Sequence, residues 1–394
     1  MNYLLVMPRF VDTIGEWYHF PLGIPYVSSS MKQSGLRVFT LNMNSREGVT
    51  REIIAEEIRA HSIDVVLTGG LSFQYPAIRE ILQAAKEVDP RIVTVAGGGI
   101  ITSAPAAGME VLEFADYGIV GEGEETTPAL CRALECGEDV MAVEGIVYRD
   151  DGVWMRTKAR KEVADLDAIP FPDYDGFDFS KIAAMVPSLF GMNEDHAITM
   201  TTRRSCPFQC TFCFHTSGSH YRKRSLDNFF EELDLLVEKY RIKYIFVSDE
   251  LFAINMQRVV EFCARIKPYN IHWWAQFRVC DGTEEMVRIL KDSNCVTMGF
   301  GLDYFATMIP DLPFVGAAGV FLIDNSKIKQ GSEVDGHLIH SPEILDADEI
   351  DTVVVPVVSL MSTIEKQIHQ AFPRVKNVIN ILDLVKPTDE KCVG

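Results

Sequence analysis

Several features are missing from this 394-residue chain, and each absence narrows what the protein can be. No window holds eighteen consecutive apolar residues, so the sequence predicts no membrane-spanning helix. The first residues show no basic segment before an apolar run and no cleavage site, so we expect no secretory signal peptide. There is no internal repeat and no low-complexity tract. The chain is therefore expected to be cytoplasmic, with no membrane partner.

Basic residues are scarce. Lys and Arg total 37 against 56 Asp and Glu, which gives a formal net charge of −19. A strongly acidic chain repels phosphate backbones, so nucleic acid is not expected as a partner. Hydrophobic residues make up 47% and charged residues 24%, which is the balance of a globular protein and excludes a disordered chain. The length suits two or three domains.

The chain has nine cysteines, which is an odd number. A disulfide framework is therefore not expected in a long chain of this type. Six of the cysteines are scattered and are predicted to act as small apolar core residues. These six are Cys131, Cys136, Cys263, Cys280, Cys295 and Cys392. The remaining three lie close together and carry the functional argument.

The first part of the chain alternates predicted strands with predicted helices, which indicates an α/β fold with a parallel, doubly wound, Rossmann-like sheet. Glycine-rich turns follow two of the predicted strands, at residues 97–99 and 121–124. Ligands of such sheets bind at the carboxyl ends of the strands. Both turns are therefore candidate binding sites in a domain that we place at residues 1–145.

The character of the chain changes after this domain. Residues 146–195 are predicted to be a hairpin around Asp151-Gly152 followed by a Pro-rich linker. A second strand–helix series over residues 196–308 suits a partial βα barrel. Residues 309–394 predict a small α/β segment that resembles the later part of a Rossmann-type module, for which we favour a structural role. Its strands either complete an irregular barrel or form a separate domain beside a truncated core.

Cys206, Cys210 and Cys213 follow a predicted strand with the spacing C-x-x-x-C-x-x-C. Three thiolates so close together can bind three corners of a cubane iron–sulfur cluster and leave one iron open. No fourth cysteine lies nearby. A zinc site is the alternative, and it would need a fourth ligand such as His215 or His220.

With Phe212 before the last cysteine, this motif resembles the signature of the radical S-adenosylmethionine (radical SAM) family. The segment 246–252 resembles that family's second strand, and Arg278 and Asp303 follow the third and fourth strands. The resemblance implies that SAM chelates the open iron and is cleaved by one electron to a 5′-deoxyadenosyl radical. It implies catalytic and metal-binding roles for Cys206, Cys210 and Cys213. It implies SAM contacts at Phe212, Ser248, Asp249, Glu250, Arg278 and Asp303.

Residues 1–175 resemble the cobalamin-binding domain that precedes many radical SAM cores. The resemblance implies cobalamin contacts at Thr68, Gly69, Ser72, Gly97, Gly98, Gly99, Gly121, Glu122 and Gly123. The D-x-H-x-x-G motif, whose histidine ligates cobalt in several mutases, is absent, because His19 is followed by a different pattern. Cobalamin without a histidine ligand remains consistent with the resemblance. A flavodoxin-like domain that binds nothing is the alternative.

Together these resemblances imply an enzyme of the cobalamin-dependent radical SAM methyltransferase and cyclase group. Its expected cofactors are a 4Fe-4S cluster, SAM and cobalamin. Its expected partners are a small-molecule substrate and an electron donor such as flavodoxin or ferredoxin. Two other hypotheses stay open: a non-catalytic iron–sulfur and cobalamin-binding protein, suggested by the short core, and a radical SAM enzyme without cobalamin.

Overall fold

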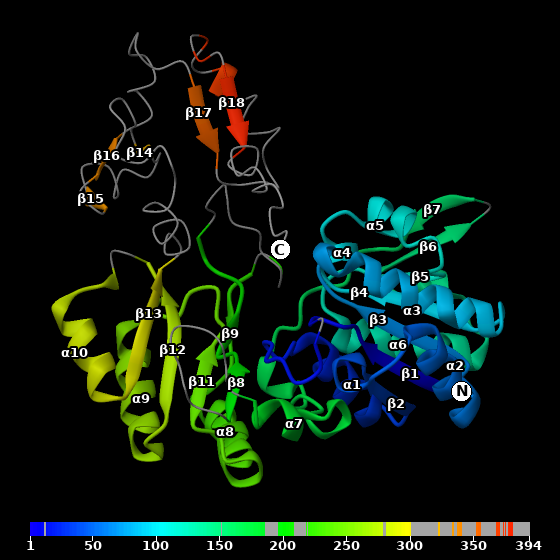
Figure 1. Ribbon diagram of the computed structural model, residues 1–394, viewed down its shortest axis with the longest axis horizontal. Helices are drawn as coiled ribbons and strands as arrows, with labels where there is room; N and C mark the ends of the chain where they lie inside the picture. The colour runs from blue at the N-terminus through cyan, green and yellow to red at the C-terminus, as the bar shows by residue number, and fades with distance from the viewer. Residues whose placement is uncertain are drawn as a thin grey trace, which may run out of the picture. The chain divides into compact units, whose positions relative to one another are not determined.

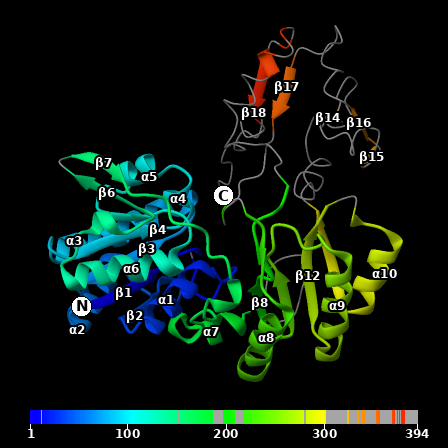
Figure 2. The ribbon, with the colours of Figure 1, turned by 180° about the vertical axis from the view of Figure 1, so that it is seen from behind.

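The computed structural model describes residues 1–11, 13–150, 152–185, 196–208, 218, 220–278 and 281–300, with short pieces between 322 and 380. The chain divides into two compact units. The first comprises Met1–Phe208, His215–Phe277 and Thr283–Met298. The second comprises Gln209–Phe214, Arg278–Gly282 and Gly299–Gly394. Figures 1 and 2 show the chain from opposite sides.

The first unit opens with a seven-stranded sheet of order β2-β1-β3-β4-β5-β6-β7. Its strands are β1 (Asn2–Met7), β2 (Arg37–Asn42), β3 (Val65–Gly69), β4 (Val93–Gly97), β5 (Tyr117–Ile119), β6 (Ile146–Asp150) and β7 (Val153–Arg156). The first five are parallel, in the flavodoxin-like order. The hairpin β6–β7 pairs antiparallel with β5. The hairpin that we had expected in the linker therefore extends the first sheet.

Helices cover both faces of this sheet. They are α1 (Gly23–Gln33), α2 (Thr50–His61), α3 (Tyr75–Val88), α4 (Gly99–Thr102), α5 (Pro105–Val111) and α6 (Gly123–Cys136). Helices α2 and α3 pack side by side on one face, and α1 packs against α6 on the other (Figures 1 and 2). Side chains alternate accordingly along β1: Leu4 packs with Ile54 of α2, while the Tyr3 hydroxyl donates to the Cys131 carbonyl of α6 at 3.1 Å. The predicted doubly wound α/β fold is thus confirmed.

The Pro-rich connector packs tightly instead of spanning open solvent. It contains the short helix α7 (Phe179–Ala183), and Phe177 and Phe179 are fully buried. The Tyr174 hydroxyl donates to Glu232 Oε1 at 2.5 Å, and Ser28 Oγ donates to Asp173 Oδ2 at 2.6 Å. Because these contacts reach helices of both sheets, the connector fastens the second sheet to the first within the same unit.

The second sheet has the order β13-β12-β11-β8. Its elements are β8 (Ala197–Met200), α8 (Leu226–Tyr240), β11 (Tyr244–Val247), α9 (Met256–Ile266), β12 (His272–Phe277), α10 (Glu284–Asp292) and β13 (Cys295–Phe300). Strand β11 runs parallel to both β8 and β12. Trp273 of β12 packs on Phe262 of α9, with ring centroids 5.0 Å apart. The next side chain, Trp274, points to the opposite face, as the two-residue period of a strand requires.

Each helix of the second sheet begins at a capping side chain. Ser225 Oγ accepts from the Asn228 amide at 3.0 Å at the start of α8. Asn255 and Thr283 play the same part for α9 and α10. Such caps satisfy amides that have no partner within the helix. The segment that returns from the cysteine loop therefore ends at Ser225, where helix α8 begins.

Shorter elements complete the description. The 3-10 helices are η1 (Met43–Ser45), η2 (Ser72–Gln74), η3 (Val140–Ala142), η4 (Leu166–Ala168), η5 (Asp175–Phe177) and η6 (Lys267–Tyr269). The second unit contains β14 (Leu322–Ile323), β15 (Glu333–Val334), β16 (His337–His340), β17 (Thr352–Val355) and β18 (Asn377–Asn380). Most of residues 309–394 lies outside the described residues, so a Rossmann-like segment there stays a prediction. Among the helices that are described, none is long and apolar enough to cross a membrane.

Candidate functional site

A two-stranded ribbon closes the base of the cysteine loop. Strand β9 (Arg203–Arg204) ends two residues before Cys206 and pairs antiparallel with β10 (Arg222–Lys223). The register places Arg204 opposite Arg222. The ribbon therefore brings the two ends of the cysteine segment together at a narrow neck. Cys206 is half-buried at this neck. The predicted residues Cys210, Phe212 and Cys213, with His215, lie outside the described residues.

The neck is held in a demanding backbone conformation. Ser205 has a φ of +63°, in the left-handed region that side chains disfavour, and its Oγ donates to the Gly218 carbonyl at 2.8 Å. Gly218 has a φ of +89°, and a Cβ there would lie 2.0 Å from Glu162 Oε1. Such strain persists only where the surroundings impose it. The segment that presents Cys206 is thus fixed on both of its sides.

The predicted SAM contact Asp249 lies at the end of β11 and is fully buried. Its carboxylate accepts from the Thr202 amide at 2.7 Å and from Thr202 Oγ1 at 2.6 Å. Arg203 Nε lies 3.3 Å from Asp249 Oδ2, and both side chains are buried. Burial raises the pKa of Asp249, while Arg203 and the Thr202 hydrogen bonds oppose that shift. Both carboxylate oxygens are engaged inside the protein and hold Thr202 and Arg203 in the segment before Cys206, and a SAM contact at Asp249 stays a prediction.

Two other predicted SAM contacts sit beside Asp249. Ser248 is exposed, and its amide donates to the Met200 carbonyl at 2.8 Å, which continues the β8–β11 ladder. Glu250 is half-buried. The carboxyl end of β11 therefore brings Ser248 and Glu250 near the strand that leads to Cys206, because β8 and β11 run in parallel register.

Arg278 directly follows β12. Its guanidinium pairs with Asp281, with Nη2–Oδ1 at 2.6 Å and Nε–Oδ2 at 3.1 Å. The side chain of Arg278 is 40% exposed. Asp303, the last predicted SAM contact, lies outside the described residues. A role for either residue in holding SAM stays a prediction.

The predicted cobalamin residues lie where β3, β4 and β5 end. Thr68 and Gly69 end β3, and Gly97 ends β4. The two turns pack on each other: a Cβ on Gly69 would lie 2.5 Å from the Gly97 carbonyl oxygen, and one on Gly98 would lie 2.7 Å from that of Gly70. Glycine is required at these positions because only glycine permits this approach.

This edge has features that fit a large polar cofactor. The Thr68 hydroxyl is buried and has no hydrogen-bond partner among the residues that the structure describes, which is uncommon for a buried polar group. Ser72, Gly98 and Gly121 are exposed along the same edge. Exposed glycines let a ligand approach the backbone closely. The described residues therefore fit a corrin or its nucleotide tail at the carboxyl ends of the strands, where ligands of such sheets bind.

Cysteine thiols make up the donor set of the candidate metal site. Within the parts of the chain that the structure describes, no group of three or more His, Cys, Asp and Glu side chains could hold a metal ion. Cys206 is the described member of the motif, and three thiols in one short loop are the ligands that iron–sulfur clusters take. His220, the possible zinc ligand, places its Nδ1 3.0 Å from Glu162 Oε2.

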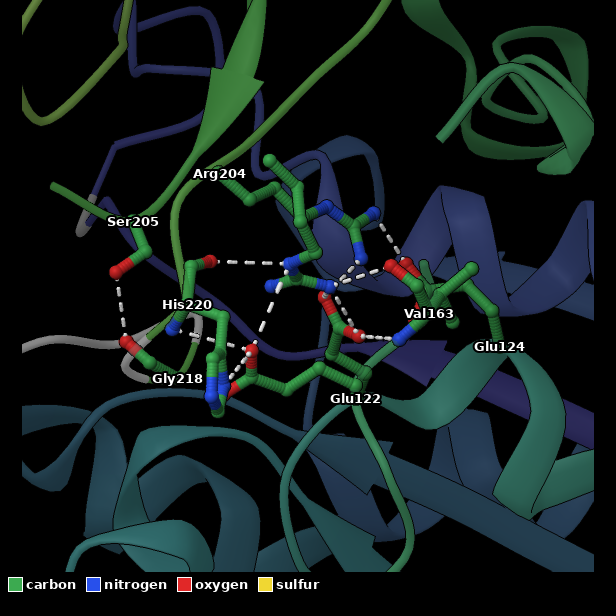
Figure 3. A network of polar contacts seen from close by, with 9 residues as sticks. Glu122, Glu124, Val163, Arg204, Ser205, Gly218 and His220 are labelled. Atoms are coloured by element: carbon green, nitrogen blue, oxygen red, sulfur yellow. Dashed lines mark hydrogen bonds and ion pairs between the residues drawn. The ribbon is translucent and has the colours of Figure 1, made fainter. Parts of the chain in front are cut away.

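Glu122, for which a cobalamin contact stays a prediction, directs its carboxylate toward Arg204 (Figure 3). Its Oε1 lies 2.7 Å from Arg204 Nη1, and Arg222 Nη1 lies 2.8 Å from both of its carboxylate oxygens. The Val163 amide donates to Glu122 Oε2 at 2.6 Å. Burial alone would raise the pKa of Glu122, but the two arginines outweigh it, and the pKa lies below its usual value.

Several residues at these sites were not found from the sequence. The loop between β1 and α1 carries Trp17 and His19, whose rings lie 5.6 Å and 4.9 Å from that of Phe246 in β11. His19 Nδ1 lies 3.3 Å from Thr199 Oγ1 of β8. The pairing of Arg204 with Glu124 was missed as well. The sequence held one signal that could have pointed to this ion pairing. Two arginines, Arg203 and Arg204, stand just before the cysteines in a chain that is otherwise acidic.

The fold and these sites define a class: an α/β protein whose flavodoxin-like sheet is joined to a second parallel sheet that carries a three-cysteine loop. Comparison with known families agrees with this class. Residues 12–131 match the B12 binding domain, and residues 200–311 match the Radical SAM superfamily. An uncharacterized methyltransferase of Pyrococcus horikoshii is 30% identical over 330 residues, which are 80% of this chain and 68% of the relative.

The chain therefore belongs to the radical SAM family whose members carry a B12-binding domain. The predicted family, fold class and cofactor set of 4Fe-4S cluster, SAM and cobalamin are thereby confirmed at the level of the family. An anaerobic magnesium-protoporphyrin IX monomethyl ester cyclase of Cereibacter sphaeroides is 24% identical over 79% of this chain. The chain spans only about half, 52%, of that cyclase.

Solved structures share the fold. The radical SAM methyltransferase TsrM from Kitasatospora setae aligns with a TM-score of 0.61 and 17% identity over 77% of this chain and 59% of its own. The cobalamin-dependent SAM radical enzyme OxsB aligns with a TM-score of 0.59 and 18% identity over 74% of this chain and 41% of its own. At such identities the likeness concerns the fold alone.

Proposed function

We propose that this protein is an enzyme that cleaves SAM reductively and serves cobalamin-dependent methylation or rearrangement of a small molecule. The observation that carries the proposal is the position of Cys206. It follows a ribbon strand whose Arg204 is bound by Glu122 of the B12-binding domain, at 2.7 Å. The two cofactor-binding parts are thus joined directly, which suits a reaction that needs both. The Pyrococcus relative, named as a methyltransferase, supports the same class of reaction.

When bound, the cluster and SAM supply a 5′-deoxyadenosyl radical, and cobalamin supplies a methyl carrier. The chain's own residues bind and orient these groups. We assign iron binding to Cys206, Cys210 and Cys213, and SAM binding to Phe212, Ser248, Glu250, Arg278 and Asp303. Asp249 fixes the segment that carries Cys206. Thr68, Gly69, Ser72, Gly97–Gly99, Gly121 and Gly123 form the proposed cobalamin edge, and the carboxylate of Glu122 pairs with Arg204 and Arg222.

The substrate we propose is a small molecule, because the relatives are named as methyltransferases and as a cyclase of a porphyrin ester. A single-electron donor such as flavodoxin or ferredoxin is required by the chemistry of reductive SAM cleavage. Nucleic acid is not proposed as a partner, since the net charge of −19 opposes it. We place the protein in the cytoplasm, where the cluster thiols stay reduced.

The test is an anaerobic assay for SAM cleavage. The cluster is reconstituted, SAM and dithionite are added, and 5′-deoxyadenosine is measured by chromatography. We expect it to accumulate with the wild-type protein and to disappear in Cys206→Ala. Cys136→Ala is the matched control, because Cys136 is exposed at the end of α6, outside the cysteine loop. It should retain the wild-type rate.

Other results separate the alternatives. A protein that holds an intact cluster but forms no 5′-deoxyadenosine would support the non-catalytic binding hypothesis and refute ours. Titration with hydroxocobalamin, followed by its visible spectrum, separates the cobalamin-dependent enzyme from a radical SAM enzyme without cobalamin. Metal analysis that finds zinc and no iron would support the alternative that the cysteine loop binds zinc, and would refute the proposed cluster.

A further inference from the structure

The acidic turn after β5 forms ion pairs that its predicted role in cobalamin binding does not explain. Glu122 and Glu124 both direct their side chains to arginines that border the cysteine loop (Figure 3). Arg204 belongs to β9, before the loop, and Arg222 to β10, after it. Glu122, which lies between β5 and α6, therefore contacts both strands of the ribbon at the loop's neck.

The geometry of these contacts is that of a strong, oriented interaction. Arg222 Nη1 lies 2.8 Å from each Glu122 oxygen and donates to the Val163 carbonyl at 2.8 Å. The Glu122 side chain is 10% exposed and that of Arg222 8%. Ion pairs that are desolvated and hydrogen-bonded in this way are strongly directional, and removing one partner leaves a buried charge uncompensated.

A second acid holds the returning strand from outside the ribbon. Glu162 Oε2 accepts from the His220 amide at 3.2 Å and lies 3.6 Å from Arg222 Nε. Glu162 also fills the space beside Gly218, where a Cβ would meet it at 2.0 Å. Both Glu122 and Glu162 lie outside the ribbon and belong to the part of the chain before it. The neck is thus clamped by residues that are remote from the cysteines in sequence.

We propose that Glu122 is a positioning residue for the cysteine loop: by binding Arg204 and Arg222 together, it keeps the neck closed and slows loss of the metal centre. This inference rests on the proposed iron site and departs from the predicted contact of Glu122 with cobalamin. Residues that orient metal ligands from outside the ligand set commonly change metal affinity by about 10–100-fold when mutated. We expect an effect of that size here.

The experiment measures metal release from the reconstituted full-length protein. A ferrous chelator is added anaerobically, and the rate of iron release is followed by absorbance, with metal content checked by mass spectrometry. Glu122→Gln should release iron at least about tenfold faster than wild type. Glu144→Gln is the matched control, because Glu144 pairs with Lys158 on the exposed surface at 2.6 Å. It should release iron at the wild-type rate.

A release rate of Glu122→Gln within twofold of wild type would overturn the proposal. Because Glu122→Gln leaves Arg222 without its main acid and can impair folding, the double variant Glu122→Gln/Arg222→Gln is measured too. It removes both members of the pair and should regain thermal stability, yet it should still release iron fast. Stability and slow release regained together would mean that the pair serves the fold alone, and would also overturn the proposal.

An additional spectroscopic readout separates positioning from stability. The reduced cluster of Glu122→Gln should show an altered electron paramagnetic resonance spectrum, while that of Glu144→Gln should match wild type. This outcome is independent of catalysis. A protein that shows fast release in Glu122→Gln, but no 5′-deoxyadenosine even as wild type, would refute the proposed function and leave the clamp standing. Wild-type protein that retains no metal would refute both.

Discussion

Arg203 and Asp249 form a fully buried ion pair that joins the segment before Cys206 to the end of β11, with Nε and Oδ2 3.3 Å apart. The same arginine lies over the rings of Tyr221 and Phe252, at 5.5 Å and 5.7 Å from their centroids. The pair thus fixes β9 from the second sheet, while Glu122 holds it from the first. The cysteine segment is thus secured from two directions.

Removal of the Asp249 charge should therefore destabilise the fold. In Asp249→Asn, Arg203 stays buried without its acid, and we expect a loss of about 3–5 kcal/mol in the free energy of unfolding. Urea denaturation at pH 7 measures it. Asp292→Asn removes an exposed partner of Lys267, 2.7 Å away, and should cost less than about 1 kcal/mol. Equal losses in the two variants would contradict the account of a buried, positioning pair.

The glycine edge gives a second prediction, on stability. Gly98 and Gly137 both have positive φ, at +84° and +65°, but only Gly98 has another backbone within reach of a Cβ. Gly137→Ala should cost about 1 kcal/mol, from backbone strain alone. Gly98→Ala adds a contact of 2.7 Å with the Gly70 carbonyl oxygen and should cost clearly more. Thermal unfolding of both variants compares them, and a smaller loss for Gly98→Ala would argue against the packed turns.

The stabilisation from Glu122 should depend on pH in one direction. Burial alone would raise its pKa, but Arg222 and Arg204 outweigh burial, and the pKa lies below its usual value. The nearby acids Glu124 and Glu162 pair with the same two arginines. A carboxylate whose folded-state pKa is lowered stabilises the fold at neutral pH, and that contribution is lost as pH falls. The difference in unfolding free energy between wild type and Glu122→Gln, measured without metal, should be full at pH 7. It should narrow below about pH 4; a difference that stays constant to pH 3 would be inconsistent with this sign.

Thiol reactivity separates the structural cysteines from the others. Burial raises the pKa of Cys263 to about 11 and that of Cys131 to about 12, so both should resist alkylation by iodoacetamide at pH 8. Cys136 is exposed and should react readily. Cys206, half-buried at the neck, should react in the metal-free protein and become protected once the cluster is reconstituted. Peptide mass spectrometry reads all four, and fast labelling of Cys263 would contradict its burial.

Local patterns in the sequence were enough for much of the fold. Alternating strand and helix signals placed the parallel strands of both sheets, and glycine clusters marked the ends of β4 and β5. The hairpin after residue 145 was recognised, but its place in the first sheet was not, because strand pairing depends on partners distant in sequence. Three of the scattered cysteines, Cys131, Cys263 and Cys295, are buried or half-buried, whereas Cys136 is exposed. Cys280 and Cys392 lie outside the described residues.

The family and its cofactor chemistry could be inferred from local motifs, because three thiols at fixed spacing and glycines at strand ends are requirements that short stretches of sequence record. How the two sheets are joined could not be inferred from such motifs and follows from the packing. Glu122 and Arg222 are 100 residues apart, and their contact depends on how the two sheets pack. The resemblance implied a cobalamin contact for Glu122, which stays a prediction, whereas the pairing of its side chain with the two arginines is a property of the packed structure, because a buried carboxylate is stable only beside compensating charge.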